Sequence, residues 1–195
     1  MNAPLWLVTG FGPFLDVQEN PSGLVARALE SDPPDGLEVR CAILPVEFEA
    51  AGPALDRALD ECPRPPVWLL SLGVHRGAWF RPEGLARAQL RSTKPDGTGR
   101  FAADLPPLGP RDLRPRVDPA RAAELLRTAG ATDARPSDDA GGYVCERTYH
   151  ANLTAAERLA IPGLFIHVPP IAKLPVGEQV QILRRALPLF ATEWA

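Results

Sequence analysis

The sequence predicts an α/β fold, a three-layer sandwich with a central, mostly parallel (mixed) sheet. Short apolar runs of strand length alternate along the chain with segments in which apolar residues have helical spacing. Three of these runs are almost continuously apolar, which is typical of strands that are covered on both faces. The 195 residues suit one domain, so we expect a single α/β domain over residues 1–195.

The first half of the chain alternates strands with helices. An apolar run that ends at a glycine predicts a strand over 5–9. A helix is expected to begin at 20–22, where proline follows Asn20, and to end before the Asp-Pro-Pro-Asp-Gly breaker. Alternating apolar residues predict a strand over 37–45. Helical spacing predicts a helix over 47–59, and the apolar run 67–72 is the third expected strand.

The second half begins with a segment that lacks a regular pattern. Residues 73–118 contain no long periodic stretch, and only a short strand around 86–90 is expected there. A loop-rich region of this length inside a domain is often functional. The remaining expected elements are helices over 119–129 and 143–159, a strand over 164–168 and a helix over 176–189.

Composition excludes several classes of protein. The net charge of −3 comes without clusters of Lys and Arg, which disfavours a nucleic-acid partner. No apolar stretch approaches the roughly 20 residues that span a bilayer, and no signal peptide is recognisable, so we expect a soluble, cytoplasmic protein with no membrane partner. The three cysteines show no disulfide pattern and no CxxC pair. We therefore expect no metal site and no cofactor.

Two residues stand where chemistry is expected. In parallel sheets, ligands bind beyond the carboxyl ends of the strands, and His167 lies near such an end. Cys145 follows a Gly-Gly pair in the first turn of an expected helix, where a thiolate has a lowered pKa and free N–H groups can hold an oxyanion. Each residue has a plainer interpretation, because lone histidines and free cysteines are usually packed in cores.

The sequence alone does not bring Cys145 and His167 together. A helix followed by its neighbouring strand makes the meeting plausible, and a third residue would then orient the imidazole. Glu83 is one of many acids in the chain that could do so.

Four segments of the chain carry a shared pattern, namely Thr9–Phe14 with Asn20-Pro21-Ser22, Ala140–Cys145, Phe165–Pro169 and Gly73–Glu83. Together they resemble the pyroglutamyl peptidase I family, also called pyrrolidone-carboxylate peptidases. The first segment, the opening signature, is the most specific part. The other three are similar to the segments that carry the family's nucleophile, histidine and glutamate, and the resemblance covers essentially the whole chain.

The resemblance implies a cysteine peptidase that removes an N-terminal pyroglutamyl residue from peptides. Cys145 is then the nucleophile, His167 the base and acid, and Glu83 the residue that holds the imidazole in the useful tautomer.

The resemblance also implies a substrate site. Phe11 and Phe14 would sandwich the lactam ring, and backbone near Gly73 and Val74 would pair with its polar atoms. Asn20 would brace the N-terminal loop, although a plain helix cap is an equally good interpretation of this residue. Family members often form tetramers, so a homo-oligomer is expected.

Departures from the family pattern leave an alternative open. The segment before Glu83 is one residue shorter than usual, and a carboxylate follows the nucleophile. The departures are Glu146, Gly84, Ala88, Pro170 and the shortened 73–83 segment. They motivate a second hypothesis, that of a divergent, weakly active or inactive relative that binds a small lactam-like or peptide ligand. A non-enzymatic α/β interaction protein would require all the motif matches to be accidental.

Overall fold

The computed structural model describes residues 3–14 and 17–194, and its described strands form one five-stranded sheet. In chain order the strands are β1 (Leu5–Phe11), β2 (Glu38–Leu44), β3 (Trp68–Val74), β4 (Arg81–Pro82) and β5 (Gly163–Val168). Their order across the sheet is β2-β1-β3-β5-β4. β2, β1, β3 and β5 run parallel to one another, and β4 runs antiparallel to β5. The predicted mostly parallel, mixed sheet is confirmed.

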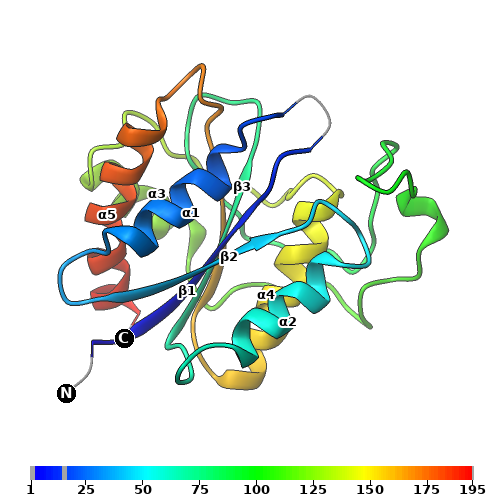
Figure 1. The fold of residues 1–195 in the computed structure, drawn as a ribbon, viewed down its shortest axis with the longest axis horizontal. Coiled ribbons are helices and arrows are strands. Elements are labelled where there is room, and N and C mark those ends of the chain that lie inside the picture. Colours follow the sequence, from blue (N-terminus) through cyan, green and yellow to red (C-terminus); the bar gives the residue numbers. More distant parts are fainter. Residues whose placement is uncertain (1–2, 15–16, 195) are drawn as a thin grey trace.

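Helices cover both faces of the sheet and complete three layers (Figure 1). One face carries α1 (Pro21–Ser31), α3 (Pro119–Thr128) and α5 (Val176–Glu193), and the other carries α2 (Ala51–Asp60) and α4 (Val144–Leu159). The helices pack on one another within each layer, α5 against both α1 and α3, and α2 against α4. None of the described helices is long and apolar enough to cross a membrane.

The sheet separates two apolar cores, because successive side chains of a strand point to opposite faces. Trp6 and Val8 of β1 belong to the core beneath α1, α3 and α5, whereas Leu7 and Phe11 belong to the core beneath α2 and α4. In the first core the rings of Trp6 and Trp68 stack with centroids 4.5 Å apart and planes 2° from parallel.

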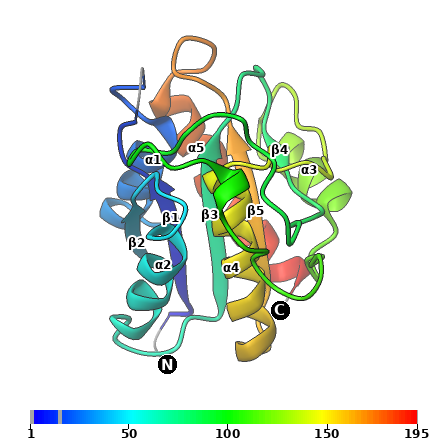
Figure 2. The same cartoon turned by 90° about the vertical axis from the view of Figure 1, so that its right-hand side faces the viewer.

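The expected strand around 86–90 was wrong. Only one isolated bridge, between Ala86 and Leu113, forms there, whereas the edge strand β4 lies a few residues earlier. The segment between β4 and α3 holds a single short 3-10 helix, Ala102–Asp104. In Figure 2 this segment, in green, lies across the upper part of α4.

The helix expected over 47–59 begins later, at Ala51. Pro53 explains the shift, because proline has no N–H and is tolerated only in the first turn of a helix. A helix that began at Glu47 would place this proline beyond its first turn. The expected start of α1 is correct: Asn20 caps that helix, and its side-chain oxygen accepts a hydrogen bond from the Ser22 N–H.

Candidate active site

A cavity of about 240 Å³ opens at the edge of the sheet where β1, β3 and β5 end. Loops that follow β1 and β3, the end of β5 and the start of α4 all contribute to its wall. The lining residues are Phe11, Phe14, Asn20, Val46, Val74, His75, Arg76, Arg81, Ala140, Gly141, Tyr143, Val144, Cys145 and His167. Of the eight residues expected at a site, six line this cavity, and Glu83 and Gly73 lie behind its wall.

His167 is held by Glu83 behind the cavity. The Nδ1 atom of His167 lies 2.7 Å from Oε1 of Glu83, and both side chains are buried. Arg81 donates from Nε to the same oxygen at 2.7 Å, while the second carboxylate oxygen of Glu83 has no partner among the described residues. Because Nδ1 faces Glu83, Nε2 is the ring nitrogen left to exchange a proton in the cavity.

Two further rings lie against the imidazole. The ring centroid of Phe165 is 4.9 Å from that of His167, and the centroid of His75 is 5.9 Å away. Glu83 reaches His167 although the preceding segment is shorter than the family pattern. The reason is that β4 pairs antiparallel with β5 and places Arg81 opposite His167. The Glu83 N–H then donates to the carbonyl of Phe165 at 2.9 Å.

Cys145 is the second residue of α4, and the turn before it needs glycine. Gly141 and Gly142 have φ values of +92° and +67°, in the left-handed region that other residues rarely adopt. The α4 cap residue, Tyr143, provides no side-chain hydrogen bond. Within the described part of the chain, no carbonyl accepts from the N–H of Cys145 or of its predecessor Val144. Donors of this kind at a helix start can stabilise negative charge on a substrate oxygen.

Gly73 lets the sulfur of Cys145 come close to the sheet. A Cβ atom on this residue would lie 3.1 Å from Sγ of Cys145 and 2.7 Å from the ring of Phe165. Gly73 is also the residue of β3 that pairs with His167. Sγ of Cys145 therefore lies beside Gly73, and the imidazole of His167 belongs to the residue paired with Gly73 on the next strand. Both side chains line one cavity, although no hydrogen bond joins them among the residues that the structure describes. A small movement of the thiol or the substrate itself has to complete the pair.

Burial dominates the acid–base properties of this pair. It raises the pKa of the Cys145 thiol to about 12, and the carboxylates of Glu83 and Glu146 act in the same direction, against Arg81. The pKa of this thiol is therefore raised and not lowered as expected for a cysteine at a helix start, because burial and two nearby carboxylates disfavour the thiolate. Burial also lowers the pKa of His167, which Glu83 partly offsets. Before substrate binds, the thiol is therefore protonated and the imidazole neutral.

The N-terminal loop is tied to the start of α1. The amide of Asn20 donates to the carbonyl of Gly12 at 3.0 Å, and its oxygen accepts from the hydroxyl of Ser22 at 2.8 Å. That hydroxyl oxygen accepts in turn from the N–H of Phe11 at 3.1 Å. Asn20 thus acts both as the cap of α1 and as a brace for the N-terminal loop. Phe11 is buried in the cavity wall, and Phe14 is half-buried beside it.

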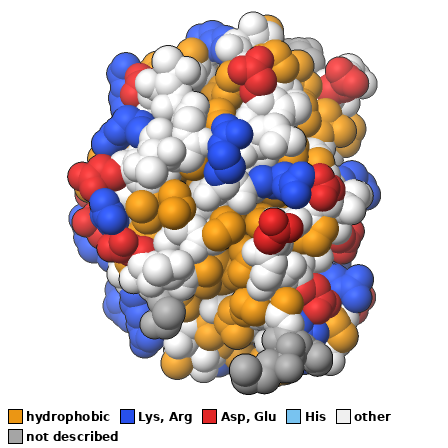
Figure 3. Space-filling view, turned by 90° about the vertical axis from the view of Figure 1, so that its left-hand side faces the viewer, with side chains coloured by type: hydrophobic (Ala, Val, Ile, Leu, Met, Phe, Trp, Pro, Cys, Tyr) orange, Lys and Arg blue, Asp and Glu red, His pale blue; other side chains and the backbone are white. Residues whose placement is uncertain are grey.

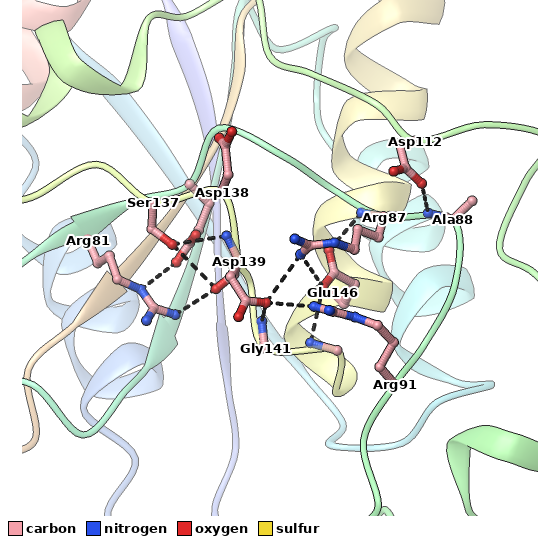
Figure 4. Close-up of polar contacts among 12 residues, drawn as sticks. Arg81, Arg87, Ala88, Arg91, Asp112, Ser137, Asp138, Asp139, Gly141 and Glu146 are labelled. Carbon is pink, nitrogen blue, oxygen red and sulfur yellow. Dashed lines mark hydrogen bonds and ion pairs between the residues drawn. The ribbon is translucent and has the colours of Figure 1, made fainter.

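Glu146 points inward and organises the turn before the nucleophile. Its carboxylate is fully buried and accepts from the backbone N–H groups of Arg87 at 2.7 Å and Gly142 at 3.1 Å. Figure 4 shows this carboxylate beside Asp139, which receives hydrogen bonds from Arg87 and Arg91. The residue that departs from the family pattern therefore holds the loop from Gly142 and the 84–91 segment together.

Two other departures have structural reasons. A Cβ atom on Gly84 would lie 2.5 Å from Oδ1 of Asp138 and 3.0 Å from Pro119, so a larger residue would force the Asp138 side chain to move. The N–H of Ala88 donates to the carboxylate of Asp112 at 2.8 Å, which fixes the backbone without help from the Ala88 side chain.

Sequence reasoning missed several cavity residues, including His75, Arg81 and Tyr143. A signal existed for Arg81: it precedes Glu83 by two residues, and residues two apart in an extended segment share a face. Tyr143 carries no such signal, because its position depends on the long segment after β4, where the carbonyl of Pro95 accepts from its hydroxyl at 3.0 Å. No group of three or more His, Cys, Asp or Glu side chains in the described ranges is arranged to hold a metal ion.

Comparisons with known proteins point to one family. A family model described as pyroglutamyl peptidase matches residues 5–184. A pyrrolidone-carboxylate peptidase of Deinococcus radiodurans is 34% identical over 191 residues, covering 89% of this chain and 82% of the relative. One from Saccharolobus islandicus is 32% identical over 166 residues, covering 84% of this chain and 78% of the relative.

Solved structures show the same fold. The pyrrolidone carboxyl peptidase of Thermus thermophilus superposes with a TM-score of 0.79 at 33% identity, covering 93% of this chain and 98% of that one. The enzyme from Fervidobacterium islandicum gives a TM-score of 0.86 at 26% identity, covering 98% and 100%.

Proposed function

The chain belongs to the pyroglutamyl peptidase family, a family of cysteine peptidases, and from that premise we propose how its residues cleave peptides after an N-terminal pyroglutamyl residue. Cys145 is the nucleophile, His167 the base and then the acid, and Glu83 the residue that orients the imidazole. The contact between Glu83 and Nδ1 of His167 carries the proposal, because it leaves Nε2 for the cavity that Cys145 lines.

The reaction begins from an uncharged pair. Nε2 of His167 takes the thiol proton as Sγ of Cys145 attacks the carbonyl carbon of the pyroglutamyl residue. The resulting tetrahedral intermediate carries its negative charge on the former carbonyl oxygen. The C–N bond then breaks, and the imidazolium gives its proton to the leaving amine, so that a thioester remains on Cys145.

Water completes the cycle. The neutral imidazole takes a proton from water as the water oxygen attacks the thioester, and the thiolate of Cys145 leaves and recovers that proton. Free pyroglutamate is released, and the enzyme returns to its starting state. Glu83 stabilises the imidazolium in both halves of the reaction, since its carboxylate lies against the protonated Nδ1.

The start of α4 supports the charged intermediate. The N–H groups of Val144 and Cys145 have no carbonyl acceptor among the described residues, so they can donate to the developing oxyanion, and the helix terminus favours negative charge. Removal of one such donor from an oxyanion site typically lowers kcat by about 10²–10³-fold.

The cavity suits a flat lactam ring. Phe11 and Phe14 supply apolar contact from the N-terminal loop, and Val74 lies on the wall beside His75. We propose that backbone groups near Val74, which lines the cavity, pair with the polar atoms of the ring, whereas Gly73 does not line it. A site built to hydrogen-bond these atoms rejects analogues that leave its own groups unpaired.

Turnover of a pyroglutamyl amide reporter tests this function. We expect the wild-type chain to release the amine, and Cys145→Ala to lower kcat/KM by at least about 10³-fold. Cys41→Ala is the matched control, because Cys41 lies on β2 outside the cavity and should leave turnover intact. A wild-type chain that folds but does not turn over the reporter would favour the inactive, ligand-binding alternative.

Location and assembly follow as proposals of their own. We propose a cytoplasmic enzyme, because Cys41, Cys62 and Cys145 are all free thiols, and reducing compartments preserve these.

We also propose a homo-oligomer, a tetramer in the first instance. Figure 3 shows the side on which α5 lies, where apolar side chains form a broken band between charged ones. Light scattering that gives the mass of one 21.1 kDa chain would contradict the oligomer.

A further inference from the structure

A second cavity, of about 370 Å³, adjoins the one that holds Cys145. The two share four lining residues and are therefore neighbours along one wall. The shared residues are Phe14, Val74, His75 and Arg76. The pyroglutamyl residue is the first of the peptide, so a neighbouring cavity is needed only for the residues that follow the scissile bond, and the second cavity is a candidate for them.

The second cavity combines apolar walls with a cationic rim. Its apolar residues are Phe14, Val17, Pro21, Val74, Pro170 and Ile171. Its charged residues are Arg76, Lys94 and Glu19. The side chains of Arg76 and Lys94 have no ion-pair partner within the part of the chain that the structure describes, whereas many other arginines are paired.

The turn that carries Arg76 is fixed before any ligand binds. Nε2 of His75 lies 2.6 Å from the carbonyl of Trp79, and Nδ1 of His75 accepts from the N–H of Gly77 at 3.3 Å. Burial lowers the pKa of His75 to about 4, so this imidazole is neutral near pH 7 and keeps both contacts. Nζ of Lys173 also donates to the carbonyl of Arg76 at 2.7 Å.

We propose that this second cavity binds the free C-terminal carboxylate of short pyroglutamyl peptides through Arg76 and Lys94. The inference rests on the proposed function and adds a substrate class to it, namely pyroglutamyl dipeptides and tripeptides with apolar residues. Each residue extends a chain by at most about 3.3–3.6 Å, so the C-terminus of a dipeptide or tripeptide stays within a few residue lengths of the scissile bond. The cavity next to the one that Cys145 lines can therefore hold it. Apolar walls strengthen the attraction between a carboxylate and the two cations.

Paired substrates test the proposal on the full chain. Pyroglutamyl-leucine and its C-terminal amide differ only in the terminal charge. We expect kcat/KM for the free acid to exceed that for the amide by about 3–10-fold at low salt, since each exposed ion pair contributes up to about 1 kcal/mol. The preference should shrink as salt screens the charges.

A double variant, Arg76→Met with Lys94→Met, should bring the ratio of acid to amide close to one. Methionine keeps the apolar length of each side chain, so loss of charge is the main change. Arg158→Met is the control: this exposed arginine lies on another part of the surface, near Asp56, and its removal should keep the ratio.

The outcomes separate the two proposals. A wild-type chain that cleaves the amide but shows no preference for the acid overturns the carboxylate site and leaves the peptidase intact. A preference that survives in the double variant overturns it as well. A chain that cleaves neither substrate nor an uncharged reporter overturns the peptidase and, with it, the carboxylate site.

Discussion

Cys145 and His167 are both uncharged before substrate binds, and burial is the reason. A thiol with its pKa raised to about 12 is protonated near pH 7, and an imidazole with a lowered pKa is neutral there. A thiolate ready for attack is therefore not the resting state of this site. The proton has to move during attack on the substrate, which makes the orientation of His167 by Glu83 more important than the intrinsic acidity of the thiol.

Alkylation of the free enzyme should report this resting state. We expect the rate of reaction of Cys145 with iodoacetamide to rise continuously from about pH 6 to about pH 10, because only the thiolate reacts. Subtracting the rate for Cys145→Ser removes the contribution of Cys41 and Cys62. A plateau near neutral pH would mean a lowered thiol pKa and would contradict the uncharged pair. Slow alkylation alone does not indicate an inactive enzyme.

The Glu83→Gln variant should affect kcat far more than KM. Glutamine has nearly the same shape as glutamate, but it cannot stabilise an imidazolium, so we expect kcat to fall by about 10²–10⁴-fold. Glu83 does not line the cavity, so KM should change little. Steady-state kinetics check this, with exposed Glu178→Gln as the control. A variant with a raised KM and an unchanged kcat would place Glu83 in substrate binding.

At the scale of helices and strands, close approach between elements creates the site. The start of α4 lies against the end of β3 because Gly73 has no side chain, and the start of α1 lies against β1 for the same reason. A Cβ atom on Gly10 would lie 2.3 Å from the carbonyl oxygen of Ser22. Glycines at these positions bring a loop, a helix start and a strand end within reach of one small substrate.

The Gly73→Ala variant should separate the sulfur from its place beside β3. The added methyl group would meet Cys145 and the ring of Phe165, and a displacement of about 1 Å can lower kcat/KM by roughly 10²-fold. Gly177→Ala on α5 is the control, since nothing lies within 4 Å of its Cβ position. Circular dichroism should show folded protein for both. Equal activity of the two variants would show that Cys145 needs no such approach.

The long segment after β4 is held in place by the buried carboxylate of Asp96. Burial alone would raise the pKa of Asp96, but hydrogen bonds from the Thr98 hydroxyl and from the backbone N–H groups of Phe48, Arg100 and Thr98 lower it. These bonds support the cavity wall as well, because Phe48 packs edge-on against Tyr143 with centroids 5.2 Å apart.

The Asp96→Asn variant should therefore lower the free energy of unfolding by about 1–3 kcal/mol at pH 7, because at least one buried donor loses its acceptor. The lowered pKa means that the ionised carboxylate stabilises the fold above its ordinary pKa near 3.8, and that this stabilisation disappears as the pH falls below that value. Urea unfolding at neutral and acidic pH should show the difference shrinking. Exposed Asp60→Asn should show neither effect.

The sequence predicts the elements of this fold better than the connections between them. Strands 67–72 and 164–168 were recognisable because burial on both faces makes them apolar throughout. The two residues of β4 carry no periodic signal, and the segment after β4 is fixed by Asp96 and by the Tyr143 contact to Pro95, which no local pattern reveals. For the site, the helix-start cysteine and the strand-end histidine had local signals, whereas their meeting at Gly73 depends on strand order.

For the whole molecule, the sheet separates an aromatic cluster of the core from the cavity that Cys145 lines. The aromatic cluster around Trp68 lies in the core beneath α1, α3 and α5, where its ring is 6.2 Å from that of Phe190 and 6.1 Å from that of Trp194. The cavity that Cys145 and His167 line contains none of these residues.

The Trp68→Ala variant should lower the free energy of unfolding by about 3–5 kcal/mol, because it leaves a cavity in a packed core. The KM of the molecules that remain folded should stay the same. Val67→Ala, next in sequence but 44% exposed, should change stability by less than about 0.5 kcal/mol. A large change in KM for Trp68→Ala would mean that the core and the cavity are coupled across the sheet.

Trapping the covalent intermediate tests the proposed chemistry most directly. Wild-type protein mixed with excess pyroglutamyl ester or amide, then quenched in acid, can be digested and examined by mass spectrometry. We predict that the peptide containing Cys145 gains the mass of one pyroglutamyl group, and that this gain is absent from Cys145→Ala. The modified fraction should be larger when hydrolysis of the thioester is slower than its formation. The account would be contradicted if Cys145 were unmodified at every quench time and Cys145→Ala turned over the substrate as fast as the wild-type chain.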